Sequence, residues 1–158
     1  MPKILQPREM RKCLGCFTCM SACSTVNYKN HSLIKSAIKV RTTGGMSSGF
    51  IAIVCLGCKD PACIEVCPGH ALEYREGGGV FLIKEKCIGC RKCESACIVH
   101  AVYFDEETKK PIICRHCGVC AHYCPHGCLV MIDVKEEPAL TQAALTAQLQ
   151  EGDKPSEI

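Results

Sequence analysis

Cysteine is the residue type in this chain that can carry chemistry. The sequence has 158 residues and 17 cysteines, sixteen of which form four groups of four. The groups are Cys13, Cys16, Cys19 and Cys23; Cys55, Cys58, Cys63 and Cys67; Cys87, Cys90, Cys93 and Cys97; and Cys114, Cys117, Cys120 and Cys124. Three groups read C-x2-C-x2-C-x3-C, and the second reads C-x2-C-x4-C-x3-C. Thiolates at this spacing bind [4Fe–4S] clusters, so the sixteen ligands predict four such clusters.

Two other uses of cysteine fit the sequence less well. Disulfides are typical of oxidising compartments, but residues 1–12 are polar and lack the apolar segment of a signal peptide, so we expect a cytoplasmic protein. Zinc sites usually contain two C-x2-C pairs separated by a longer loop, whereas these four groups repeat one compact pattern. No apolar run has the length of a membrane span.

The remaining reactive side chains are expected to support the clusters and not to bind them. Cys128, the seventeenth cysteine, is interpreted as a small buried side chain at the start of a strand; a redox-active thiol or substitute ligand is the alternative. Four histidines lie late in the sequence: His100, His116, His122 and His126. Because all sixteen thiolates are present, we expect these histidines at the surface or around the ligands.

No motif in the sequence predicts catalysis by this chain. Residues 45–49 match the G-x-S-x-G nucleophile pattern, but they lie between two expected strands and do not precede a helix, so we predict a turn. There is no phosphate-binding loop and no dinucleotide fingerprint. We therefore predict no catalytic residues and no cofactor besides the clusters.

The composition indicates that inorganic clusters fill the interior. Aromatic residues make up 5% of the chain and tryptophan is absent, so the side chains that usually fill a core are scarce. Without clusters the chain should be poorly folded, because the free energy of ligation is also free energy of folding. The formal charge is +3; four clusters of about −2 each would bring it to roughly −5. No basic stripe with interleaved aromatic residues indicates nucleic-acid binding.

The segments between the cysteine groups predict short β-hairpins, in an α+β fold. The expected strands are, in pairs, 34–41 with 49–54, 71–74 with 80–83, and 101–104 with 111–113, followed by a single strand at 129–132. A short helical turn fits between the third and fourth cysteines of each group. The segment 138–150 is rich in alanine, leucine and glutamine, which predicts an amphipathic helix that packs on its own domain or docks to a partner; 152–158 reads as a flexible end.

The cysteine groups resemble those of a known family. Residues 55–68, with the sequence Cys-Leu-Gly-Cys-Lys-Asp-Pro-Ala-Cys-Ile-Glu-Val-Cys-Pro, look like the second group of four-cluster electron-transfer subunits of molybdenum and tungsten oxidoreductases. Examples are the subunits of dimethyl sulfoxide reductase, formate dehydrogenase and polysulfide reductase. Residues 87–93 are similar to the third group of that family. The resemblance covers about residues 8–133.

This resemblance implies a domain of two pseudo-symmetric ferredoxin-like halves over residues 1–134. One half would comprise about 8–54 plus 110–134, the other about 55–109, and 135–158 would form a docking or packing helix with a tail. The family pattern implies these ligand sets: Cys13, Cys16, Cys19 and Cys124; Cys114, Cys117, Cys120 and Cys23; Cys55, Cys58, Cys63 and Cys97; and Cys87, Cys90, Cys93 and Cys67.

The resemblance also implies a partner enzyme. The compact fourth group, residues 114–128, looks like the small subunits of tungsten aldehyde oxidoreductases and benzoyl-CoA reductases. We therefore predict a non-catalytic electron-transfer subunit of anaerobic metabolism. It would conduct electrons between a large tungsten or molybdenum pterin subunit of the aldehyde oxidoreductase type and a flavin- or NAD-binding subunit or a ferredoxin.

Other functions stay open on the sequence. They are a free polyferredoxin, an adaptor for hydrogenase or carbon monoxide dehydrogenase, and an interaction scaffold whose metals are structural. The density of clusters also raises the hypothesis of end-to-end stacking into higher-order assemblies.

Overall fold

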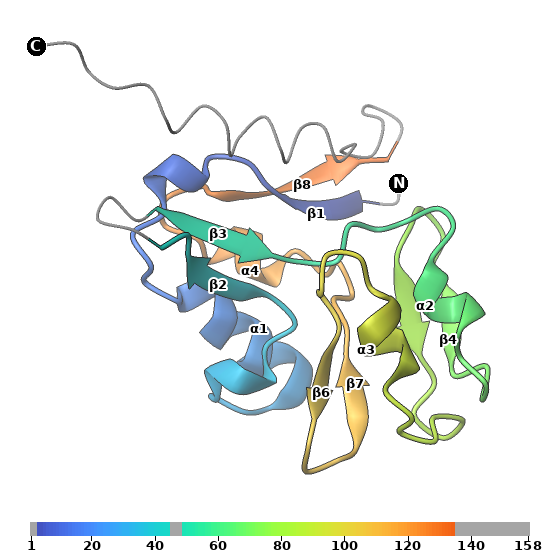
Figure 1. Ribbon diagram of the computed structural model, residues 1–158. Coiled ribbons are helices and arrows are strands. Elements are labelled where there is room, and N and C mark those ends of the chain that lie inside the picture. The colour runs from blue at the N-terminus through green and yellow to red at the C-terminus, as the bar shows by residue number, and fades with distance from the viewer. Residues whose placement is uncertain (1–2, 45–48, 135–158) are drawn as a thin grey trace, which may run out of the picture.

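The computed structural model describes residues 3–44 and 49–134 (Figure 1). In chain order these residues form β1 (Lys3–Pro7), a 3-10 turn (Met10–Lys12), α1 (Thr18–Tyr28), a 3-10 turn (Leu33–Lys35), β2 (Lys39–Thr42), β3 (Phe50–Ile53), α2 (Ala62–Glu65), β4 (Leu72–Tyr74), β5 (Val80–Leu82), α3 (Lys92–Ala96), β6 (Tyr103–Asp105), β7 (Lys110–Ile112), α4 (Val119–His122) and β8 (Leu129–Asp133). The helix predicted at 138–150 and most of the turn predicted at 45–49 lie outside the described residues.

Each sheet in this part of the chain is a pair of antiparallel strands. Three pairs are the hairpins that the sequence predicts, β2–β3, β4–β5 and β6–β7. The fourth pairs β8 with β1, so that Lys3 lies opposite Asp133. β1 was not predicted, because its partner is at the other end of the described chain. This pairing holds the first and fourth cysteine groups close together.

The strand predicted at 34–41 is wrong in its first half. Residues Leu33–Lys35 form a 3-10 turn, and β2 begins only at Lys39. The hydroxyl of Ser32 accepts a hydrogen bond from the backbone N–H of Ile34 at 3.3 Å, and the buried hydroxyl of Ser36 donates to the carbonyl of Ile38 at 2.8 Å. Such local hydrogen bonds of serine compete with a strand ladder, which explains the turn.

Every α-helix in the described residues begins one residue before the third cysteine of a group. In the first, third and fourth groups the residue before the helix has a left-handed backbone: Phe17 (φ 56°), Arg91 (φ 62°) and Gly118 (φ 78°). The second group, with two extra residues, has Pro61 at this place with an ordinary φ of −80°. The tight x2 spacing therefore forces a left-handed turn between two cysteines, and the x4 spacing relieves it.

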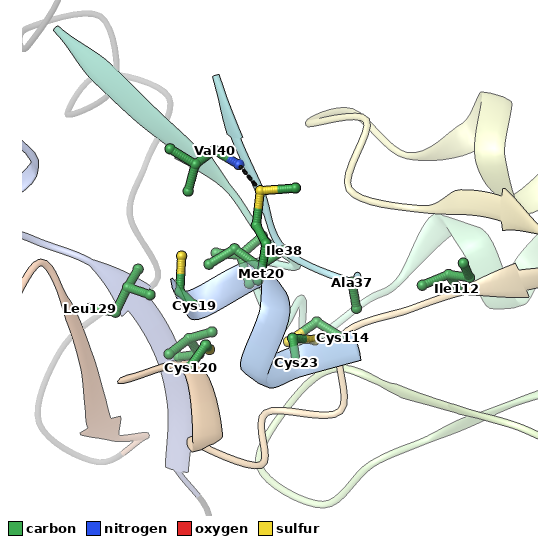
Figure 2. Packing of buried hydrophobic residues seen from close by; sticks show 12 residues of the cluster. Cys19, Met20, Cys23, Ala37, Ile38, Val40, Ile112, Cys114, Cys120 and Leu129 are labelled. Atoms are coloured by element: carbon green, nitrogen blue, oxygen red, sulfur yellow. Dashed lines mark hydrogen bonds between the residues drawn. The ribbon is translucent and has the colours of Figure 1, made fainter. Parts of the chain in front are cut away.

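The buried residues form two clusters, and cysteines are prominent in both. The first contains Leu5, Cys19, Met20, Cys23, Ala37, Ile38, Val40, Val54, Ile112, Cys114, Cys120 and Leu129. Figure 2 shows its side chains converging from α1, β2 and the chain near β7, with the Val40 N–H donating to Met20 Sδ at 3.3 Å. The second contains Leu72, Val80, Cys93, Val102 and Ile113.

The β6–β7 hairpin lies between these two clusters. Figure 1 shows it between α1 with β2–β3 on one side and α2, α3 and β4 on the other. Ile112 belongs to the first cluster and Ile113 to the second, because successive side chains of an extended chain point to opposite faces. α1 packs on α4, and α2 packs on α3.

Candidate metal centres

The first cysteine site combines three cysteines of the first group with the last cysteine of the fourth. A hollow of about 360 Å³, partly open to solvent, is lined by Cys13, Cys16, Cys19 and Cys124. α1 supplies Cys19, and the turn after α4 supplies Cys124. Burial raises the pKa of the Cys19 thiol to about 11, and nearby thiolates at Cys124, Cys16 and Cys13 raise it further. Side chains from the first and the last cysteine group therefore influence one another directly.

The second cysteine site combines three cysteines of the fourth group with the last cysteine of the first. A hollow of about 320 Å³ is lined by Cys114, Cys117 and Cys120 of the fourth group and by Cys23 of the first. Burial raises the pKa of Cys120 to about 12, with a further contribution from the thiolates of Cys23 and Cys117. Burial also raises the pKa of Cys114 far above its ordinary value.

The thiols of the second and third groups also influence one another. Burial raises the pKa of Cys63 to about 12, and the next largest contributions come from Cys55, Cys97 and Cys58.

Burial likewise raises the pKa of Cys93 to about 11, and Cys90, Cys67 and Cys87 add to it. Each of these two thiols is thus surrounded by two further cysteines of its own group and the fourth cysteine of the other group.

The arrangement of the thiols fits a multi-iron cluster. All seventeen cysteines are free thiols. In the described residues, no group of three or more His, Cys, Asp or Glu side chains is placed to hold a single metal ion. Raised pKa values mean that the buried thiolates need a bound cation to stay ionised.

Backbone N–H groups point at the fourth cysteine of three groups. The N–H four residues further on donates to Sγ at 3.3 Å, from Ala71 to Cys67, from Ala101 to Cys97, and from Cys128 to Cys124. Hydrogen bonds of this kind stabilise negative charge on ligand sulfur and tune the bound cluster.

Asn27 supplies the corresponding donor in the first group. Cys23 lies inside α1, whose backbone N–H groups take part in the helix. The side-chain amide of Asn27, again four residues further on, lies 3.7 Å from the Sγ atoms of both Cys23 and Cys117. Asn27 was not predicted from the sequence. The feature that could have identified it is an amide side chain one helical turn beyond the last cysteine of the group.

Lys39 is a buried cation near the second site, and sequence reasoning missed it too. It is 9% exposed, donates to the carbonyls of Leu33 and Ile34, and lies 4.9 Å from the ring centre of Tyr103. Burial lowers its pKa, while the thiolate of Cys23 favours its charged form. A cation in this place offsets part of the negative charge of the second site.

The histidines occupy different environments. His100 and His122 are exposed, and His126 is partly exposed. His116 is 3% exposed and lies within the fourth cysteine group.

Cys128 is buried directly before β8, where a small buried side chain was predicted; it is 2% exposed. It also lines the first hollow and is in hydrogen-bonding contact with the thiols of Cys124 and Cys13. Burial raises its pKa to about 12. Cys128 is therefore a neutral neighbour of the first site.

Replacing Cys128 with alanine is expected to leave the iron content unchanged, because four other thiols line the same hollow. The measurement is iron and acid-labile sulfide per chain after anaerobic purification. Cys19→Ala, in the same hollow, is the matched control and should lose about a quarter of the iron, one cluster of four. An equal loss in Cys128→Ala would make Cys128 a ligand.

Known proteins are similar to this chain in sequence. A family model described as "4Fe-4S dicluster domain" matches residues 86–128, which hold the third and fourth groups. One chain of the anaerobic dimethyl sulfoxide reductase from Escherichia coli is 30% identical over 139 residues, covering 74% of this chain and 67% of the relative. An uncharacterised ferredoxin of Methanocaldococcus jannaschii is 32% identical over 125 residues, covering 78% and 69%. The chain belongs to the ferredoxin-type iron–sulfur electron-transfer proteins.

Family membership confirms the predicted [4Fe–4S] cofactors and the α+β fold of short hairpins and helices. A relative from Salmonella typhi, 28% identical over 136 residues, is named the electron transfer subunit of thiosulfate reductase. A subunit of tetrathionate reductase from Salmonella typhimurium is 26% identical over 142 residues, covering 81% of this chain. The chain spans only 57% of that relative's length. Within the described residues, no helix has the length and apolarity needed to cross a membrane.

Proposed function

We propose that this chain is the electron-transfer subunit of a molybdopterin reductase and carries four [4Fe–4S] clusters. The observation that carries the proposal is that in each of four sets of thiols one cysteine has a pKa raised by burial and by the thiolates of other members of its set. Two relatives are named as parts of reductases, which supports a reductase as the partner enzyme.

The proposed ligand sets are those of the family pattern. They are Cys13, Cys16, Cys19 and Cys124; Cys114, Cys117, Cys120 and Cys23; Cys55, Cys58, Cys63 and Cys97; and Cys87, Cys90, Cys93 and Cys67. The first two sets are supported by the cysteines that line the two hollows. The last two are supported by the thiolates that raise the pKa values of Cys63 and Cys93.

The proposed division into two halves has its own support. The β1–β8 pair and the packing of α1 on α4 join the first and fourth groups. The packing of α2 on α3 joins the second and third groups. The two buried clusters follow the same division, with the β6–β7 hairpin between them.

The cysteines of this chain bind the clusters. Buried cysteines shield one side of a cluster from water, and exposed cysteines leave another side near the surface. When bound, [4Fe–4S] clusters accept and release one electron at a time. In every group the second cysteine is exposed: Cys16, Cys58, Cys90 and Cys117. The buried third cysteines Cys19, Cys93 and Cys120 hold the opposite side in the core. Each site therefore has one edge that a redox partner can approach.

Two features weigh on the choice of partner. The compact fourth group, residues 114–128, resembles small subunits of tungsten aldehyde oxidoreductases, but two of the similar proteins are named for the reduction of dimethyl sulfoxide and tetrathionate. They favour a molybdopterin reductase. A free polyferredoxin is the second candidate, because a relative of similar coverage is named a ferredoxin.

The test is a metal and acid-labile sulfide analysis of the complex that copurifies anaerobically with the tagged chain from its native source. We expect about sixteen iron and sixteen sulfide per copy of this chain, beyond those of the partner, together with molybdenum. Tungsten instead would favour the aldehyde oxidoreductase partner, and an isolated monomer with full iron would favour the free polyferredoxin. Zinc without sulfide would contradict the cluster assignment itself.

A further inference from the structure

His116 stands where the other three cysteine groups have glycine. The residue before the second cysteine is Gly15, Gly57 or Gly89 in those groups, with φ between 66° and 72°. His116 adopts nearly the same left-handed backbone, with φ 51°. Glycine accepts this conformation freely, whereas a histidine is strained in it. His116 therefore keeps the backbone of the repeated turn and adds a side chain that the other three groups lack at this position.

One nitrogen of the His116 ring is occupied by β1. The backbone N–H of Leu5 donates to Nδ1 at 3.0 Å, so Nδ1 is an acceptor and carries no hydrogen. An imidazole whose Nδ1 accepts is neutral and has its hydrogen on Nε2.

The other nitrogen faces the second cysteine group. Among the described residues, the buried Nε2 has no hydrogen-bond partner. A methyl group added at Gly79 would lie 2.9 Å from Nε2 and 3.9 Å from the Cα of Gly57. Gly57 lies between Cys55 and Cys58. The ring of His116 therefore lies beside Gly79, which is itself close to Gly57 in the Cys55–Cys58 loop.

A buried N–H donor needs an acceptor, and none of the described residues supplies one. We propose that Nε2–H of His116 donates a hydrogen bond to a sulfur atom of the iron–sulfur cluster held by the Cys55–Cys58 loop. This inference rests on the proposed ligand sets. The hydrogen bond stabilises the more negative, reduced form of that cluster and so raises its reduction potential. His116 thereby tunes one cluster from the loop that binds another.

The test is an EPR-monitored redox titration of the anaerobically reconstituted full chain and three variants. His116→Phe keeps a flat ring without the donor, His116→Gln keeps an N–H donor, and His122→Phe removes an exposed histidine of the same group as the matched control. We expect one midpoint potential to become more negative in His116→Phe, to return toward the wild-type value in His116→Gln, and to stay unchanged in His122→Phe. No shift, or an equal shift of all clusters, would overturn the proposal.

A second measurement uses the wild-type fold and is needed if the His116 variants fail to bind iron. In the wild-type chain labelled with ¹⁵N-histidine, pulsed EPR should detect a histidine nitrogen coupled to a reduced cluster, and the coupling should persist in His122→Phe. Absence of the coupling would overturn the proposal. Iron and sulfide content of the same samples tests the number of clusters separately. A failure of the proposed function would therefore be distinguishable from a failure of the His116 assignment.

Discussion

Removal of the clusters is expected to unfold most of the described chain. Cysteines make up four of the twelve members of the first buried cluster, and the largest fully buried apolar side chains are only Leu5, Ile38 and Val80. Each such side chain stabilises the fold by about 1.5–3 kcal/mol. The sheets are pairs of strands, and an isolated pair is marginal in water. Structural metal sites contribute roughly 10–16 kcal/mol, about as much as the whole stability of a domain.

The measurement is amide hydrogen exchange and far-ultraviolet circular dichroism before and after anaerobic treatment with an iron chelator and an oxidant. We expect protection to be lost in β1, α1 and β8 together, because α1 and the turn before β8 carry ligands of the same sites. The control is the same incubation without chelator. Retained protection in an iron-free sample would contradict the view that the clusters are the core.

Replacement of Gly78 with alanine should be the most damaging change outside the cysteines. A methyl group there would lie 2.3 Å from the carbonyl oxygen and 3.1 Å from the carbonyl carbon of Gly57, and Gly78 has φ 107°. The backbone of the Gly57 loop cannot move away without moving Cys55 and Cys58. Steric overlap and backbone strain each cost about 1–3 kcal/mol, so we expect a loss of about 3–5 kcal/mol in the free energy of unfolding.

Gly44→Ala is the matched control for this change. Gly44 also has a positive φ, 85°, but no atom of the described residues lies within 4 Å of the place its methyl group would take. Both variants place alanine in a left-handed backbone. The difference between their anaerobic thermal midpoints therefore measures the steric overlap between residue 78 and the carbonyl group of Gly57. Equal midpoints for the two variants would show that the contact between Gly78 and Gly57 contributes nothing to stability.

The cofactor could be predicted from spacing alone, because the reach of neighbouring thiolates is a local property. Cysteines separated by two residues bring their side chains to one cluster whatever the rest of the chain does. The hairpins at β4–β5 and β6–β7 were likewise predictable from apolar runs and turn residues close in sequence. The strand predicted at 34–41 was partly wrong, because hydrogen bonds of Ser32 and Ser36 outweighed the apolar alternation.

Long-range pairing needed the tertiary structure. β1 is a short strand whose partner β8 lies at the opposite end of the described chain, and nothing in its local sequence specifies that partner. The same holds for Asn27 beside Cys117 and for Lys39 over the ring of Tyr103. Their side chains are ordinary in sequence and acquire a role only through neighbours brought together by folding.

His116 illustrates the division between what the sequence determines and what only the tertiary structure decides. The sequence by itself determined that a histidine replaces the repeated glycine before the second cysteine, since the groups can be compared residue by residue. Only the tertiary structure decided that its Nδ1 accepts from Leu5 and that its Nε2 lies beside Gly79, close to Gly57 of another cysteine group. The number and type of clusters follow from short-range spacing, whereas the surroundings that tune each cluster follow from contacts between distant segments.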